Sequence, residues 1–107
     1  MSTRDLSIRT NVLKRLSKEK VAYNMEKIKQ QQKIDAMVAK DPEDYNIKQQ
    51  RGVLEETLDM LPDVDRRLKA AHQDLANCVM SAHPDVKASK EYEDAVQALE
   101  TYSENSA

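Results

Sequence analysis

Residues 47–75, IKQQRGVLEETLDMLPDVDRRLKAAHQDL, dominate the fold that the sequence predicts. A large aliphatic side chain recurs there at strict seven-residue intervals, at Ile47, Leu54, Leu61, Leu68 and Leu75. Such a repeat places the aliphatic side chains in one stripe along a helix, where they face neighbouring helices. The stretch therefore predicts a long helix, which we expect to run from about residue 45 to residue 80.

Pro62 stands inside this helix, directly after the central leucine. Proline lacks the backbone N–H and its ring clashes with the preceding turn, which costs roughly 3 kcal/mol or more in a helix interior. The seven-residue register continues across Pro62, and the proline itself falls outside the apolar stripe. This pattern favours one helix that is kinked at Pro62. The alternative is a new helix that begins there, with proline in its first turn.

Two further helices are indicated on either side of this one. Apolar residues spaced by three and four predict a helix over about residues 10–40, with Lys20, Lys27 and Gln30 on the same face. The same spacing predicts a shorter helix over about residues 86–102. Short proline-containing connections separate the three segments, so we expect neighbouring helices to run antiparallel.

Composition agrees with an all-α protein. The chain has 107 residues with only one Gly and three Pro, too few turn residues for a sandwich or a barrel. We expect an all-α, antiparallel three-helix bundle in a single domain of residues 1–107, with two long helices and a shorter third, and a frayed tail over residues 103–107. Because the third helix covers only half of the long hairpin, we expect four aliphatic residues to stay partly exposed: Ile34, Met37, Ile47 and Leu54.

Charge and hydropathy exclude several classes of protein. The net charge is −2, which provides no strong field for nucleic acid or anionic lipid. No apolar run approaches the roughly 18 residues of a membrane-spanning helix, and the first ten residues lack the apolar stretch of a secretory signal. The single cysteine, Cys78, has no partner for an internal disulfide. We therefore expect a cytoplasmic protein that binds neither nucleic acid nor membrane.

Residues with catalytic or metal-binding chemistry are sparse. His72, Cys78 and His83 do not have the spacing of adjacent ligands on a helix, and we expect all three at the surface or its boundary. The carboxylates alternate with Lys and Arg, as in solvated helix-stabilising pairs. No glycine-rich loop is present to hold phosphate. The sequence thus predicts no enzyme, no metal and no cofactor.

Two basic stretches belong to different predicted helices. Lys14, Arg15, Lys18 and Lys20 lie on the first, and Arg66, Arg67 and Lys69 lie on the second. In the antiparallel hairpin Leu16 faces Leu68, which brings the two stretches side by side. They form either a positive patch for an acidic partner or an ordinary solvated face.

Three sequence blocks, in this order, carry a more specific signal: LKRLSKEKVAY (residues 13–23), DYNIKQQRGVLEET (44–57) and MLPDVDRRLKAAHQDL (60–75). Together they resemble the tubulin-binding cofactor A family, also called tubulin-specific chaperone A. The resemblance implies a cytoplasmic, cytoskeleton-associated helical protein that captures β-tubulin folding intermediates after chaperonin release. It passes them toward αβ-tubulin assembly without ATP, with other tubulin-folding cofactors involved only indirectly. The family includes monomers and homodimers.

The resemblance also implies which polar side chains contact β-tubulin. In the first helix the matching positions are Lys14, Arg15, Lys18, Glu19 and Lys20, and in the second they are Asp44, Tyr45, Lys48, Gln50, Asp63, Arg66 and Arg67. Tubulin is acidic, so the basic stretches offer it a complementary surface. The alternative function is a structural coiled-coil adaptor or assembly subunit, in which the heptads serve self-association.

Overall fold

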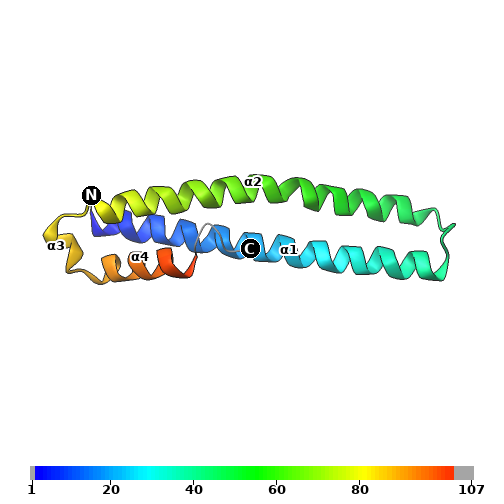
Figure 1. Cartoon of the computed structure of the whole chain (residues 1–107), viewed down its shortest axis with the longest axis horizontal. Coiled ribbons are helices and arrows are strands. Elements are labelled where there is room, and N and C mark those ends of the chain that lie inside the picture. The colour runs from blue at the N-terminus through cyan, green and yellow to red at the C-terminus, as the bar shows by residue number, and fades with distance from the viewer. Residues whose placement is uncertain (1, 103–107) are drawn as a thin grey trace. The chain divides into compact units, whose positions relative to one another are not determined.

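The computed structural model describes residues 2–102, and helices are its only regular secondary structure in that range. In chain order they are α1 (Thr3–Lys40), α2 (Asn46–Met80), α3 (Pro84–Lys87) and α4 (Lys90–Thr101), shown in Figure 1. The all-α class is confirmed, although residues 2–102 form four helices where we expected three. The tail for which we expected fraying, residues 103–107, lies outside the described range.

The first helix begins earlier than predicted, at Thr3 instead of near Thr10. Ser2 and Asp5 cap it reciprocally: the Ser2 hydroxyl accepts from the Asp5 N–H at 3.1 Å, and the Asp5 carboxylate accepts from the Ser2 N–H at 3.4 Å. The hydrogen bond from the Ser2 backbone also lowers the pKa of the Asp5 carboxyl. The sequence feature that indicates a helix start at Thr3 is the serine followed three residues later by an acid, Ser2 and Asp5.

The last predicted helix is divided in two at Ser89. This residue is extended, with φ −85° and ψ 158°, and its hydroxyl accepts from the Tyr92 N–H at 3.2 Å. A serine in this conformation caps a new helix, because its oxygen satisfies an amide that has no partner in the first turn. The continuous helix over residues 86–102 was therefore a wrong prediction, and α4 begins at Lys90.

The chain forms two compact units. Unit 1 combines Met1–Lys18 with Arg66–Ala107, and unit 2 is Glu19–Asp65. Each unit takes one part of α1 and one part of α2, so the boundary crosses two continuous helices. That the whole chain behaves as a single domain stays a prediction.

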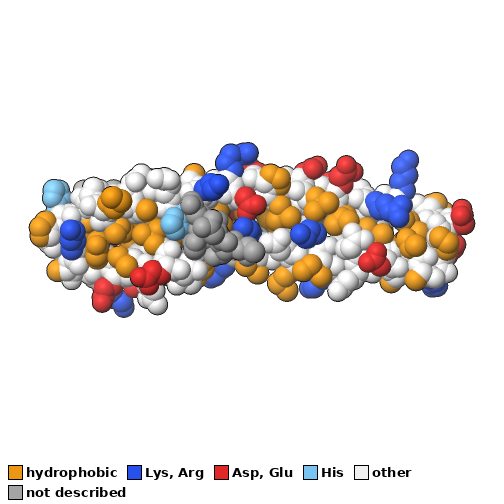
Figure 2. All heavy atoms as spheres, viewed as in Figure 1, with side chains coloured by type: hydrophobic (Ala, Val, Ile, Leu, Met, Phe, Trp, Pro, Cys, Tyr) orange, Lys and Arg blue, Asp and Glu red, His pale blue; other side chains and the backbone are white. Residues whose placement is uncertain are grey.

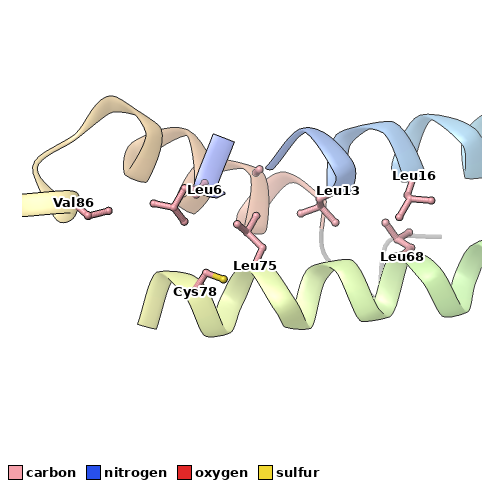
Figure 3. Close-up of a cluster of buried hydrophobic side chains, with 9 residues drawn as sticks. Leu6, Leu13, Leu16, Leu68, Leu75, Cys78 and Val86 are labelled. Carbon is pink, nitrogen blue, oxygen red and sulfur yellow. The ribbon is translucent and has the colours of Figure 1, made fainter. Parts of the chain in front are cut away.

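Unit 1 has an apolar core made by α1, α2, α3 and α4. Its buried residues are Leu6, Leu13, Leu16, Leu68, Leu75, Cys78, Val86, Ala95 and Ala98. Leu16 and Leu68 point toward one another in Figure 3, as predicted for this pair of residues. Burying each large aliphatic side chain contributes about 1.5–3 kcal/mol.

Cys78 is part of this core, with only 6% of its surface exposed. We had expected a surface or boundary position, and that prediction was wrong. Cys78 follows Leu75 by three residues, so the helical period carries it onto the same buried stripe. The sequence contained this signal, because free cysteine behaves as a small apolar side chain.

α4 lies beside the unit 1 part of α1 in Figure 1, and its buried side chains belong to the same core as those of α1 and α2. Ala95 and Ala98 are buried, and such small side chains let the α4 backbone approach its neighbours closely. The Leu99 carbonyl lies 3.3 Å from Nε2 of His72 on α2. His72 is therefore half-buried beside α4, at the boundary where we expected it.

Unit 2 is a helical hairpin that turns at residues 41–45. At the turn the Asp44 carboxylate accepts from the Asn46 N–H at 2.9 Å, and so caps the start of α2. Ile34 and Ile47 are only 3% and 5% exposed, so the expected exposure of these two residues was wrong. Side chains that lie between the two helices of a hairpin are buried by those two helices, without a third. Met37 and Leu54 are half-buried, as expected.

Polar side chains of α1 pair with polar groups of α2 in unit 2. The Lys20 ammonium lies 2.8 Å from the Asp65 carboxylate, and the Lys20 side chain is only 16% exposed. The Gln30 amide donates at 2.9 Å both to the Gln50 carbonyl and to the Gln50 side-chain oxygen. Lys27 is half-buried. The polar residues that the heptad pattern placed on the apolar face of the first helix do turn inward.

α2 continues through Pro62, which is exposed on the helix surface. This favours the single-helix interpretation over a new helix beginning at the proline. Because Pro62 has no N–H, the carbonyl of Leu58 receives no helical hydrogen bond from it. The kink at this position stays a prediction.

Candidate protein-binding surface

Within residues 2–102 no group of three or more His, Cys, Asp or Glu side chains is placed to hold a metal ion. Burial raises the pKa of the Cys78 thiol, which disfavours the thiolate that a nucleophile requires. In the same range no helix has both the length and the apolar character needed to cross a membrane.

Arg66 and Arg67 lie on α2 in unit 1, and both side chains are exposed. Both also take part in interactions within the molecule. Because they are consecutive on a helix, their side chains diverge by about 100° around its axis. A single flat partner surface would therefore contact one of them more fully than the other.

The three cations of the predicted contact set that lie on the unit 1 part of α1 have different surroundings. Arg15 and Lys18 are exposed. Lys14 is half-buried and lines a hollow of about 230 Å³ whose other walls come mainly from α4, including Asp94. The packing of α4 therefore places a carboxylate near Lys14 that the sequence pairing of the long helices did not predict.

Several predicted contact residues of unit 2 already have interaction partners within the protein. Lys20 pairs with Asp65, Gln50 accepts from Gln30, and Asp63 also has an interaction partner. Glu19 and Asp63 are half-buried. The interactions of Lys20 and Gln50 within unit 2 explain why these residues are polar without a contact to a partner protein.

The tip of the hairpin is more accessible. Tyr45 is 87% exposed, and Lys48 beside it is exposed too. Tyrosine is enriched at protein interfaces, because its large ring buries much surface at a small entropic cost. Of the twelve predicted contact residues, Tyr45 therefore has the strongest physical case as an anchor.

Sequence reasoning missed the exposed apolar side chains of unit 2. On α1, Val21, Met25 and Ile28 each keep more than half of their surface exposed, at spacings of four and three. Figure 2 shows apolar side chains interleaved with charged ones on the visible face. The same helical periodicity that revealed the core would have revealed this second stripe.

A groove also runs between α1 and α2 in unit 2, with a volume of about 450 Å³. We call it the unit-2 groove, and it is lined by Gln31, Ile34, Asp35, Val38, Arg51, Leu54, Glu55 and Leu58. Its lining combines four aliphatic side chains with charges of both signs. An accessible apolar groove of this kind suits a protein segment better than a polar small molecule.

Comparison with known proteins confirms the family resemblance that the three sequence blocks indicated. The family model described as tubulin binding cofactor A matches residues 1–99. Tubulin-specific chaperone A of Homo sapiens is 42% identical over 98 residues, which cover 92% of this chain and 90% of the human protein.

Two solved structures are similar in fold as well. Human tubulin chaperone cofactor a has a TM-score of 0.79 and 39% identity, covering 92% of this chain and 95% of that one. Tubulin folding cofactor A from Arabidopsis thaliana has a TM-score of 0.82 and 32% identity, covering 94% of each chain. The chain therefore belongs to the tubulin binding cofactor A family.

Proposed function

We propose that this protein is a tubulin-folding cofactor that captures β-tubulin folding intermediates after chaperonin release and passes them toward αβ-tubulin assembly. The observation that carries the proposal is the family match over residues 1–99, together with 42% identity to a tubulin-specific chaperone across 92% of the chain. The protein acts without ATP and without catalysis, in the cytoplasm and near the cytoskeleton. It interacts with other tubulin-folding cofactors only indirectly, through the tubulin that it transfers.

The exposed members of the predicted contact set suit an acidic partner. These are Arg15, Lys18, Tyr45, Lys48, Arg66 and Arg67. Charge complementarity raises the rate and selectivity of association more than the final affinity. A carrier without an energy source must also release its cargo. A largely polar helical surface with few aromatic anchors favours moderate affinity and hence release.

The charged part of this proposal is tested by reversing Arg66 and Arg67 to Glu in the full chain. We expect unchanged helicity by circular dichroism and weaker retention of β-tubulin, with the larger loss at low salt, where exposed charges are least screened. The matched control reverses Lys29 and Lys33, two exposed cations of unit 2 outside the predicted set.

Equal β-tubulin binding by both double variants and the wild type, at low and physiological salt, would remove the arginines from the contact surface. Light scattering on the same samples separates monomer from homodimer. A stable oligomer that ignores β-tubulin would support the coiled-coil adaptor instead.

A further inference from the structure

The unit-2 groove has an apolar floor and charged walls. Ile34 is buried at its base, whereas Leu58 at its edge is 43% exposed. The lining contains two acids, Asp35 and Glu55, and one cation, Arg51, so it carries one net negative charge. Isolated exposed leucines are common on protein surfaces, but a leucine beside a groove with an aliphatic floor forms a continuous apolar surface.

Unit 1 shows what kind of segment fills the groove between the same two helices. There α4 packs beside Lys14 of α1 and His72 of α2. Lys14 and Asp35 are 21 positions apart, and His72 and Leu58 are 14 positions apart, which are whole numbers of heptads. Asp35 and Leu58 of the unit-2 groove therefore occupy the heptad positions at which α4 packs in unit 1.

The dimensions and charge of the groove define its occupant further. Its α1 wall extends from Gln31 to Val38, about 10 Å or two helical turns. A helix of that length presents apolar side chains at positions i, i+3 or i+4, and i+7. The negative lining favours basic residues beside that apolar stripe. It disfavours α4 of a second copy, whose sequence KEYEDAVQALET has one lysine against four acids.

We propose that the unit-2 groove binds an amphipathic helix with basic flanks that the captured polypeptide has not yet buried. Incompletely folded chains expose the apolar faces of helices that later pack into their cores. The inference rests on the proposed function and adds a second contact, of opposite charge preference, to the cationic surface. Docking of the helix covers Leu58 and places its cations beside Asp35 and Glu55.

Two pairs of substitutions in the full chain test this contact. Leu58→Glu and Glu55→Lys alter the groove. Val53→Glu and Glu56→Lys are their matched controls, because Val53 is also 43% exposed and both control residues lie outside the groove lining on the same helix. The probe is β-tubulin diluted from denaturant, titrated with each variant and resolved by native electrophoresis. We expect the groove variants to bind roughly tenfold or more weakly, as truncation of an interface anchor does, and the controls to bind like the wild type.

A photo-activated cross-linker at position 58 identifies the occupant directly. We expect it to capture a β-tubulin segment with helical apolar spacing and basic neighbours, whereas the same reagent at position 53 captures much less. Failure of the wild type to bind β-tubulin would overturn the proposed function itself. Wild-type binding with equal affinity in all four variants would overturn the groove alone. A wild-type dimer that Leu58→Glu dissociates, without loss of β-tubulin binding, would identify a second copy as the occupant and also overturn the inference.

Discussion

The surroundings of a side chain in this protein do not follow from its residue type alone. Lys20 is polar but turned inward and paired with Asp65, whereas Ile28 is apolar and exposed. Cys78, the lone cysteine, lies inside the unit 1 core. Its chemistry is therefore coupled to whether unit 1 is folded.

Burial is the main cause that raises the pKa of the Cys78 thiol above its ordinary value of 9.0. The folded chain therefore keeps the thiol proton at a pH where the unfolded chain loses it. The contribution of this group to stability is complete below pH 9.0 and is lost as pH rises through the higher folded-state pKa. We expect urea unfolding to show this alkaline loss in the wild type and a smaller loss in Cys78→Ala.

Thiol reactivity provides the independent check on Cys78. A colorimetric disulfide reagent is expected to react slowly with the native protein and rapidly in urea. Rapid reaction of the native protein would contradict the burial of Cys78 and the pH dependence with it.

The elements are set by their ends and interruptions. Ser2 caps the start of α1, Ser89 separates α3 from α4, and Pro62 stands within α2. Each acts through the backbone hydrogen bonds that it supplies or removes, so each effect is local and can be tested by one substitution.

Replacing Ser89 with Ala removes the oxygen that satisfies the Tyr92 N–H. Loss of such a cap typically costs about 0.5–2 kcal/mol, so we expect a lower urea midpoint for unfolding. The control is Ser81→Ala, because the Ser81 hydroxyl is exposed and donates only to the Asn77 carbonyl at the end of α2. Equal midpoints for the two variants would show that the cap does not stabilise α4.

Replacing Pro62 with Ala restores an N–H for the Leu58 carbonyl. Proline in a helix interior costs roughly 3 kcal/mol or more relative to ordinary residues, so the variant is expected to be more helical and more stable. We also propose that Pro62 curves the surface that receives β-tubulin, and on that basis expect weaker capture. Circular dichroism, thermal unfolding and a β-tubulin binding assay measure the three effects. A stabilised variant with unchanged capture would contradict the curvature hypothesis while leaving the helix argument intact.

At the scale of the whole molecule, the two units differ in the interactions that stabilise each of them internally. Unit 1 has a continuous aliphatic core, and unit 2 combines buried Ile34, Ile47 and Val64 with the polar pairs of Lys20 and Gln30. A hydrogen bond between polar groups that water also solvates contributes only about 0.5–1.5 kcal/mol net, less than burial of a large aliphatic side chain. We therefore expect local opening to require less free energy in unit 2.

Hydrogen exchange read out by mass spectrometry tests this difference. We expect backbone amides of residues 20–40 and 47–64 to exchange sooner than those of residues 68–78, the part of α2 that contributes Leu68, Leu75 and Cys78 to the unit 1 core. Replacing both Gln30 and Gln50 with Leu should slow exchange in unit 2 alone, because it substitutes apolar burial for a polar pair. Uniform protection across α2 would contradict the proposed difference.

Much of the fold followed from periodicity in the sequence. The heptads through Leu68 and Leu75 and the inward-turned Lys20 and Gln30 were predicted correctly, because helical spacing is a local property of consecutive residues. The three sequence blocks likewise indicate the family, because they depend only on the order and identity of residues along the chain. The break at Ser89 was missed because a serine cap competes with helix continuation through a single hydrogen bond.

Burial, in contrast, depended on how the helices were assembled. Ile34 and Ile47 are buried although no third helix belongs to their unit, Lys14 lies near Asp94 only because α4 packs there, and Leu58 borders a groove. None of these facts is encoded in the spacing of neighbouring residues. Periodicity specifies which side chains share a face of a helix, but the exposure of that face is set by segments that are distant in the chain.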